Sequence, residues 1–501
     1  MTYVLILFHN VFFQIQTCKI KLIVRDNIER NNRMKKYSVV ICGGGSTYTP
    51  DMLELLVMLQ KPFPLKRVVL YDIDEQRQQV VGEFGKVLFK DYLPDVEFEY
   101  TLDKKTAFEG IDFAFVQIRA GGMEQRNYDE KIPYKYGLIG QETCGPGGMS
   151  YGVRSVVQMI ELIKDIRTYA KDAWIINYSN PAAIVAEACK MVFPNDKKVV
   201  NICDMPTDIL GRYLGYIGRK KSEVYPIYFG LNHYGWFTQI IDKKTGKDIL
   251  PDILKYVTEN YESLRAELVS KDRGPEDHWS KVFVDHLDMV KEFPYSIPST
   301  YNLYYMNPET AITHYTKEHT RYDEVIAGRE KNVFAYCREI TSLGKMKGTR
   351  YDITDKISPY TEFNGEMNTE TVYSDNDVHA AYLVELVLSI INNKNNLALV
   401  MVKNDGIIPN LDPGMMLEVT CMIGKEDIKP INQGPCPTFE KGLLENQYAC
   451  EHLLVEAILE HDDQKLLQAF TENRLVRDYK LAKQLVADFK KANGDYWPEF
   501  K

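Results

Sequence analysis

The segment NICDMPTD, residues 201–208, places a thiol beside a carboxylate. The run before it, KKVVNIC, is apolar and β-branched and predicts a buried strand that ends at Cys203. His233 follows in FGLNHYGWF, after another strand-like run. If both residues lie at the carboxyl ends of parallel strands, their sulfur and imidazole can share a divalent metal ion and leave positions open for a substrate. The alternatives are a buried apolar thiol and a hydrogen-bonded core histidine.

A glycine-rich turn offers a second kind of chemistry. The apolar run YSVVIC leads into glycines 43–45, and a helical pattern, STYTPDMLELLVMLQ, follows. The strand-like segment RVVLYDID then brings in an acid after the second strand, which completes a βαβ dinucleotide unit. Glycines let a pyrophosphate approach the backbone at a helix N-terminus, and the acid can accept ribose hydroxyls. The turn lacks a strict GxGxxG, and its alternative is a tight turn without a ligand. The predicted cofactor residues are Gly43, Gly44, Gly45, Ser46, Thr47 and Asp72.

Two further segments carry titratable groups. The loop IGQETCGPGGMSYG holds Glu142, which could tune the acidity of a neighbour, although the loop could equally be structural. The segment IPSTYNLYYMNP holds Tyr301, for which core packing is the default interpretation. A tyrosine acts as a general base only if its pKa falls far below its usual ~10, which requires a nearby cation.

Alternating strand and helix patterns must position these residues. Strand-like segments at 112–119 and 173–180 flank a helical segment at 153–170, and the alternation continues to about residue 240. This order predicts an α/β fold with a mostly parallel, doubly wound Rossmann-like sheet. Beyond about residue 250 helical patterns dominate, and 397–435 predicts further strands and loops.

Composition narrows the function classes. The chain has 501 residues, of which 45% are hydrophobic, enough for more than one structural lobe. Its net charge is -9 and no basic patch dominates, which argues against a nucleic-acid partner. Nine cysteines occur without any CxxC spacing, a pattern typical of reduced thiols in a cytoplasm.

The first 33 residues precede the first predicted strand. Their apolar start has no basic n-region and no small-residue cleavage site, and polar residues interrupt it too often for a membrane span. We interpret Met34 as the initiator and 1–33 as a non-native extension, the alternative being a genuine disordered or membrane-touching segment. The expected division is 1–33, a nucleotide-binding domain at 34–230 and a substrate domain at 231–501.

Six motifs occur along the chain: VVICGGGSTYTP, IPYKYGLIGQETCGPGG, INYSNPAAIVAEA, NICDMP, FGLNHYGW and IPSTYNLYYM. Taken together, they resemble the family 4 glycoside hydrolases, which are NAD- and metal-dependent, and the likeness extends from about residue 37 to the end. It implies a lactate/malate dehydrogenase-type nucleotide domain and a mainly helical α+β catalytic domain. Cys-Asp-Met-Pro is the pattern of the 6-phospho-α-glucosidases, whereas relatives acting on β-linkages generally carry Asn in place of Asp204.

The resemblance also implies a role for each site residue. Cys203 and His233 would hold Mn²⁺ or another divalent ion, and Asp204 would be the general acid on the leaving group. Tyr301 would be the base, and Glu142 would raise the basicity of that tyrosine. Arg126, Asn180 and Arg321 match positions that contact the substrate.

The implied reaction is oxidation of a sugar at C3 by NAD⁺, deprotonation at C2, elimination of the leaving group and addition of water. The implied substrate is a phosphorylated disaccharide such as maltose 6′-phosphate, met by a cytoplasmic homodimer or homotetramer with no membrane partner. Three alternatives remain: the same chemistry on a β-linked or non-glucose phosphate, an NAD-dependent hydroxyacid dehydrogenase, and a nucleotide-binding regulatory protein without catalysis.

Overall fold

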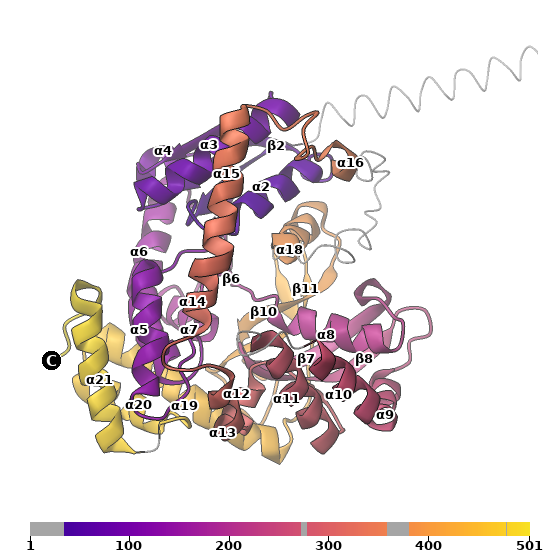
Figure 1. Cartoon of the computed structure of the whole chain (residues 1–501), viewed down its shortest axis with the longest axis vertical. Coiled ribbons are helices and arrows are strands. Elements are labelled where there is room, and N and C mark those ends of the chain that lie inside the picture. Colours follow the sequence, from indigo (N-terminus) through magenta and orange to yellow (C-terminus); the bar gives the residue numbers. More distant parts are fainter. Residues whose placement is uncertain (1–34, 272–277, 358–379, 477) are drawn as a thin grey trace, which may run out of the picture.

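The computed structural model describes residues 35–271, 278–357, 380–476 and 478–501 (Figure 1). The extension at 1–33 and the proposed initiator Met34 lie outside these residues, so the interpretation of both stays a prediction.

One mixed sheet runs through the described chain. Its twelve strands follow the order β3-β2-β1-β4-β5-β6-β10-β11-β7-β8-β9, and β12 pairs with β11. The first six strands are parallel and have the 3-2-1-4-5-6 order of a Rossmann fold, which confirms the predicted fold class. These strands are β1 (Tyr37–Cys42), β2 (Leu65–Tyr71), β3 (Glu97–Thr101), β4 (Phe113–Val116), β5 (Trp174–Asn177) and β6 (Val199–Asn201).

Helices cover both faces of the parallel part because its central strands are apolar on both sides. In β4 and β5 every residue is buried. The connecting helices are α2 (Thr49–Met58), α3 (Glu75–Tyr92), α4 (Lys104–Phe108), α5 (Gly122–Tyr134), α6 (Gly145–Tyr169) and α7 (Ala182–Val192).

The strand that leads to His233 is antiparallel to its neighbours, which corrects the expectation of parallel strands there. β7 (Val224–Leu231) and β8 (Tyr234–Asp242) form a hairpin in which Leu231 pairs with Tyr234. The two-residue turn, Asn232-His233, is too short for a parallel crossover, so the chain must reverse direction. His233 therefore projects from a hairpin turn, with a φ of 141°.

Strands from late in the chain lie between β6 and β7. β10 (Asn396–Lys403) pairs with β6, and β11 (Met416–Ile423) pairs with β7, so the sheet continues across the expected boundary near residue 230. The segment 397–435 thus contains strands, as predicted. The expected domain division itself stays a prediction. The remaining strands are β9 (Ile297–Pro298) and β12 (Ile428–Pro430).

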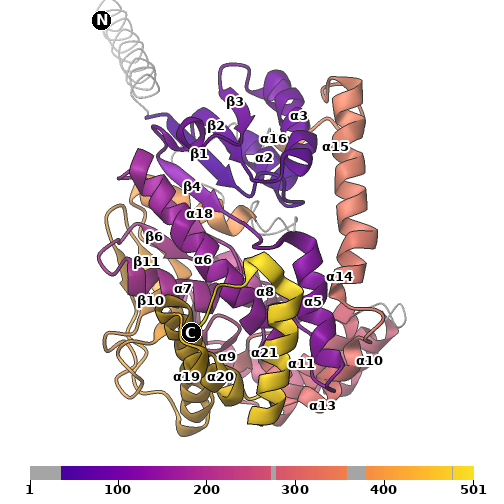
Figure 2. The same ribbon diagram turned by 90° about the vertical axis from the view of Figure 1, so that its left-hand side faces the viewer.

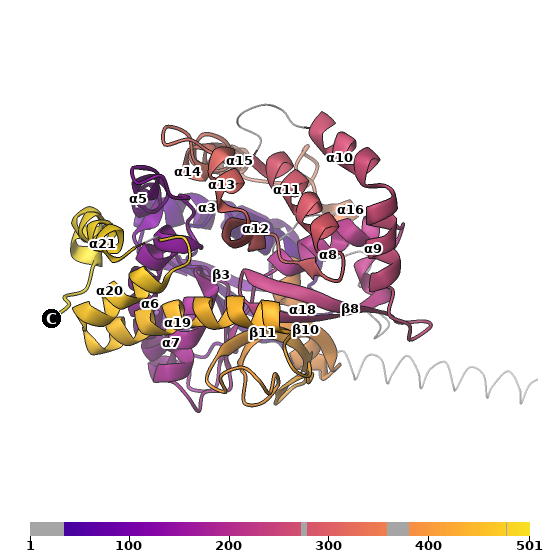
Figure 3. The same cartoon turned by 90° about the horizontal axis from the view of Figure 1, so that it is seen from below.

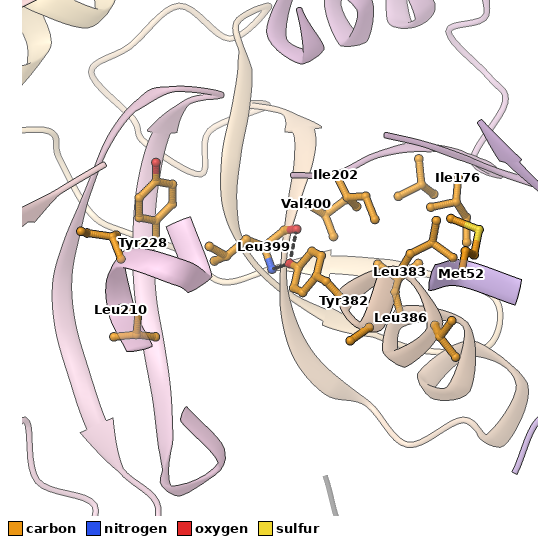
Figure 4. Close-up of a cluster of buried hydrophobic side chains, with 14 of the residues drawn as sticks. Met52, Ile176, Ile202, Leu210, Tyr228, Tyr382, Leu383, Leu386, Leu399 and Val400 are labelled. Atoms are coloured by element: carbon orange, nitrogen blue, oxygen red, sulfur yellow. Dashed lines mark hydrogen bonds between the residues drawn. The ribbon is translucent and has the colours of Figure 1, made fainter. Parts of the chain in front are cut away.

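A core shared by both halves stabilises this arrangement. Figure 4 shows Met52 and Ile176 of the first half beside Leu383 and Leu386 of α18 (Ala380–Asn392). The Tyr382 hydroxyl, at the same helix, donates to the carbonyl oxygen of Leu399 at 2.6 Å. This bond satisfies a polar group inside the apolar cluster.

Most of the remaining helices belong to the second half of the chain. Figure 1 shows α15 running along the molecule to α3, and Figure 2 shows the same helix at one side. In Figure 3, α19–α21 lie on the opposite side from α9 and α10. No helix in the described ranges is long and apolar enough to cross a membrane. The remaining helices of the described residues, in both halves, are α8 (Met205–Tyr216), α9 (Leu250–Glu259), α10 (Tyr261–Ser270), α11 (His278–Glu292), α12 (Asn302–Met306), α13 (Pro308–Ala311), α14 (Arg321–Glu324), α15 (Lys331–Leu343), α16 (Thr354–Ile357), α19 (Thr438–Glu460), α20 (Asp463–Glu472) and α21 (Tyr479–Asn493), with short helical turns at η1 (Lys221–Glu223), η2 (Ile312–His314), η3 (Val325–Glu330) and η5 (Gly494–Tyr496).

Candidate active site

A cavity of about 1600 Å³ extends from the glycine turn after β1 to the β7–β8 hairpin. It brings together nearly all of the site residues predicted from the sequence. One exception is Gly44, which packs beneath the turn, where an added Cβ would lie 2.7 Å from Cβ of Leu70. The predicted residues on the cavity wall are Gly43, Gly45, Ser46, Thr47, Asp72, Arg126, Glu142, Asn180, Cys203, Asp204, His233, Tyr301 and Arg321.

The glycine turn after β1 is tight and packs closely against its neighbours. Gly43 has a φ of 88°, and an added Cβ would lie 2.7 Å from the carbonyl oxygen of Gln117. Only glycine fits this left-handed position, and the turn leads directly into the N-terminus of α2. Asp72 at the end of β2 accepts the backbone N–H of Gly45 at 2.7 Å. Its carboxylate therefore holds the turn in shape, and the predicted contact with ribose stays a prediction.

The two predicted metal ligands meet in the cavity. Cys203 Sγ lies 3.5 Å from His233 Nε2, although the residues are thirty positions apart. One ion at about 2.0–2.3 Å from each donor fits this separation. Burial lowers the pKa of His233 to about 4, so the imidazole is neutral and able to ligate at pH 7. Among the described residues no group of three or more His, Cys, Asp or Glu could hold a metal ion, and Cys203 and His233 stand as a pair of donors.

Two hydrogen bonds to the backbone of Gly235 hold the predicted base beside this pair. The N–H of Ser299 donates to the carbonyl oxygen of Gly235 at 2.7 Å, and the N–H of Gly235 donates to the side chain of Asn302 at 3.2 Å. Tyr301 lies between Ser299 and Asn302 in sequence. The centroid of its ring is 4.8 Å from the centroid of the His233 ring. The segment that carries Tyr301 is thus fixed to the hairpin that carries the imidazole.

The protein alone favours the protonated form of Tyr301. Burial raises the pKa of its hydroxyl above the usual range, and Cys144 and Glu142 act in the same direction, while Arg321 opposes them. The sign of the Glu142 effect agrees with the basicity-raising role that the resemblance implies. A tyrosinate here needs an added positive charge, which a cation on Cys203 and His233 would provide.

Glu142 lies between two arginines at the entrance to α6. Its carboxylate accepts a hydrogen bond from Arg119 and lies 3.2 Å from Nη2 of Arg126. Burial alone would raise the pKa of Glu142, but the two guanidinium groups outweigh it and the pKa is lowered. Arg126 is fixed in turn by Glu130, whose Oε1 accepts from its Nε at 2.7 Å. Glu142 is therefore an anion held in a defined position.

Asp204 occupies the N-cap position of α8 directly after Cys203. Asp204 is only 8% exposed, and its side chain makes no capping hydrogen bond to the helix. Tyr178 lies close to it: burial and the Asp204 carboxylate both raise the pKa of the Tyr178 hydroxyl. The buried Asp204 carboxyl group therefore lies against Tyr178 and lines the cavity.

The remaining predicted contacts line the same cavity from two further elements. Asn180 follows β5, and its carbonyl oxygen accepts from Ser155 Oγ at 3.0 Å. Arg321 begins α14, pairs with Glu324, and lies with its guanidinium carbon 5.8 Å from the centroid of the Trp279 ring.

Sequence reasoning missed two residues behind these groups. Arg119, the anchor of Glu142, ends the strand-like run at 112–119, a position from which it could have been proposed. Glu418 on β11 is fully buried and accepts from Asn232 Nδ2 at 3.1 Å, next to His233. Burial raises the pKa of Glu418 to about 8. The sequence feature that could have identified Glu418 is a single glutamate inside an apolar strand pattern.

The sheet has the strand order of a nucleotide-binding enzyme, and the cavity beside its glycine turn contains the paired thiol and imidazole of Cys203 and His233. The profile of the family 4 glycosyl hydrolases matches residues 38–213, and that of the family 4 glycosyl hydrolase C-terminal domain matches residues 228–476. The chain belongs to this family.

Known relatives extend over almost the whole chain. The phospho-alpha-glucosidase PagL of Clostridium acetobutylicum is 45% identical over 467 residues, which cover 93% of this chain and 100% of that protein. The 6-phospho-alpha-glucosidase of Leptotrichia buccalis is 41% identical over 469 residues, again 93% and 100% of the two chains. Among solved structures, a 6-phospho-alpha-glucosidase from gut microorganisms in complex with NAD and Mn²⁺ superposes with a TM-score of 0.83 at 43% identity, covering 93% and 100%.

Proposed function

We propose that this chain hydrolyses α-linked 6-phosphoglucosides, such as maltose 6′-phosphate, with NAD and Mn²⁺ as cofactors. One observation carries the proposal: a thiol and an imidazole 3.5 Å apart share a single cavity with a glycine turn, a buried aspartate and a tyrosine. The names of the relatives and the NAD and Mn²⁺ in a homologous structure support the same substrate and cofactors.

The residues present fit both cofactors. The turn at Gly43 and the N-terminus of α2 would hold the pyrophosphate, and Cys203 with His233 would hold the metal. When bound, NAD supplies a reversible hydride transfer and Mn²⁺ supplies Lewis-acid polarisation of a sugar oxygen.

The chain's own side chains would divide the proton transfers. Tyr301, beside His233, would remove the C2 proton, and the anionic Glu142 held by Arg119 would keep that tyrosine basic. Asp204, next to Cys203 in sequence, would give a proton to the departing oxygen, which lies one bond from C1. Arg126, Asn180 and Arg321, which also line the cavity, would contact the sugar phosphate.

The α-linkage of the substrate, the cellular location and the oligomeric state are parts of the same proposal. Asp204 in Cys-Asp-Met-Pro and the α-specific relatives favour an α-linked substrate. Phosphorylated disaccharides arise inside cells by phosphorylating uptake, so we expect a cytoplasmic enzyme. A homodimer or homotetramer remains a prediction.

The test is the release of p-nitrophenol from α- and β-linked glucoside 6-phosphates, with and without NAD⁺ and Mn²⁺. We expect turnover of the α-isomer only when both cofactors are present, with no net NADH. Faster release from the β-isomer would overturn the α-assignment. NADH formed stoichiometrically with product would favour the dehydrogenase alternative, and release after complete removal of both cofactors would reject the mechanism.

A further inference from the structure

One face of α8 lines the part of the cavity that extends away from Asp204, the proposed acid. Starting at Asp204, side chains and glycines at intervals of three and four residues along α8 border the cavity, which places them on one face of the helix. Asp208 and Gly215 on this face are exposed, so the cavity opens toward solvent along it. The residues of this face are Asp204, Asp208, Gly211, Arg212 and Gly215.

An aromatic surface on α11 borders the same part of the cavity. Trp279 and Phe283 are four residues apart, half-buried, and stacked with ring centroids 5.7 Å apart and planes 27° apart. Both line the cavity. The guanidinium carbon of Arg212 lies 3.5 Å from the centroid of the Phe283 ring, so the charged edge of α8 meets the aromatic surface of α11.

A buried hydrogen-bond pair fixes the two helices behind this surface. The Tyr213 hydroxyl lies 2.9 Å from Nδ1 of His286, and Nε2 of His286 lies 2.9 Å from the carbonyl oxygen of Pro298. Tyr213 and His286 are each 1% exposed. The α8–α11 groove, bounded by Asp208, Arg212, Trp279 and Phe283, is therefore a preformed feature between fixed helices.

Accepting the proposed function, we propose that the α8–α11 groove is the leaving-group subsite and that it binds the second hexose of the disaccharide phosphate. The groove begins at the acid that would protonate the departing oxygen, so the departing sugar must extend along it. The apolar C–H face of a pyranose packs on an aromatic ring such as Trp279, while the charged groups of Asp208 and Arg212 suit sugar hydroxyls. The open end of the groove leaves room for leaving groups longer than one hexose.

The test compares two substrates that share the phosphorylated glucose and differ only in the leaving group. Maltose 6′-phosphate fills the groove, whereas methyl α-glucoside 6-phosphate does not reach it. We expect Trp279→Ala to lower kcat/KM for maltose 6′-phosphate about tenfold relative to the methyl glycoside, because one stacking contact is lost. The inhibition constant of glucose 6-phosphate should stay within about twofold of the wild-type value.

Two further variants separate binding from structural damage. Trp279→Phe keeps an aromatic ring and should restore most of the preference for the disaccharide. Phe293→Ala removes an aromatic residue just past the end of α11 that stacks on Phe439 and does not line the cavity, so it should leave the ratio unchanged.

Each result has a distinct meaning. An unchanged ratio in Trp279→Ala, or a rise in the glucose 6-phosphate inhibition constant, would overturn the groove assignment, the second by placing Trp279 under the phosphorylated glucose instead. If the wild-type enzyme cleaves neither substrate, the proposed function fails and the groove assignment falls with it.

Discussion

At the scale of single residues, burial sets the protonation state of the proposed metal ligands. His233 is 4% exposed, and burial keeps its imidazole neutral near pH 7. Burial also raises the pKa of the Cys203 thiol, and the neighbouring Asp204 and Glu418 carboxylates add to this effect. A divalent cation reverses the balance, because it stabilises the thiolate directly. The pair is thus arranged to bind a cation strongly only when the thiol gives up its proton.

Replacing the sulfur ligand tests this arrangement. Cys203→Ser should weaken Mn²⁺ binding at least about tenfold and lower activity in parallel, because a serine hydroxyl stays protonated. Free Mn²⁺ measured by electron paramagnetic resonance gives the affinity without relying on turnover. Cys436→Ser, at a buried thiol that does not line the cavity, is the matched control. An unchanged Mn²⁺ affinity in Cys203→Ser would exclude the ligand role.

The proposed acid has its own test. Asp204→Asn should lower kcat for maltose 6′-phosphate far more than for p-nitrophenyl α-glucoside 6-phosphate, since nitrophenolate leaves without a proton. From the usual size of general-acid catalysis, we expect the loss of kcat on maltose 6′-phosphate to exceed the loss on the p-nitrophenyl substrate by about tenfold or more. Equal losses on both substrates would argue against Asp204 as the acid.

The sequence predicted the residue types of the site better than their surroundings. Cysteine, histidine and glycine in their local patterns were enough to propose Cys203, His233 and the turn at 43–45. The ion pair of Arg119 with Glu142 and the contact of Glu418 with Asn232 join residues from separate elements. Such pairs depend on the tertiary fold, so local spacing does not contain them.

At the scale of elements, the junction of α8 and α11 depends on a neutral histidine. In His286 one ring nitrogen bonds the Pro298 carbonyl and therefore carries the proton, which leaves the other to accept from Tyr213. Burial lowers the pKa of His286 to about 4, against an unfolded value near 6.5. The unfolded chain therefore binds more protons between these values, and stability falls as the pH drops through this window.

Removing the titration should make that dependence weaker. Between pH 7 and pH 5 we expect His286 to account for a loss of about 2 kcal/mol in the free energy of unfolding. The His286→Gln variant can still donate and accept hydrogen bonds but does not titrate. Its free energy of unfolding should therefore fall by correspondingly less between pH 7 and pH 5. Denaturant unfolding of both proteins at the two pH values measures the difference. Identical losses would show that His286 is not neutral in the native state.

The direction of the strand that leads to His233 was the element-level feature that the sequence predicted wrongly. The apolar patterns predicted the strands themselves, including 37–42 and the segment around 228–240. They could not reveal that β10 and β11 enter the sheet between β6 and β7, because pairing over some two hundred residues leaves no local signal. The two-residue turn at Asn232-His233 was the available clue to a hairpin.

At the scale of the whole molecule, the second half of the chain reaches back to the cofactor turn. From Arg321, the helical stretch α14–η3–α15 runs alongside α3, and Glu330 pairs with Arg77 at 2.9 Å. In the same stretch the guanidinium carbon of Arg329 lies 3.6 Å from the centroid of the Tyr48 ring, directly after the glycine turn. One continuous segment therefore connects the proposed sugar contact to the nucleotide turn.

The isotope content of the released sugar is the most direct test of the proposed mechanism. When maltose 6′-phosphate is hydrolysed in D₂O with NAD⁺ and Mn²⁺, glucose 6-phosphate formed from the phosphorylated ring should carry deuterium at C2. Glucose 6-phosphate incubated without enzyme serves as the control for exchange. Mass spectrometry and proton NMR locate the label. Deuterium at C2 is the result that abstraction by Tyr301 predicts, and full turnover with only protium at C2 would contradict the mechanism.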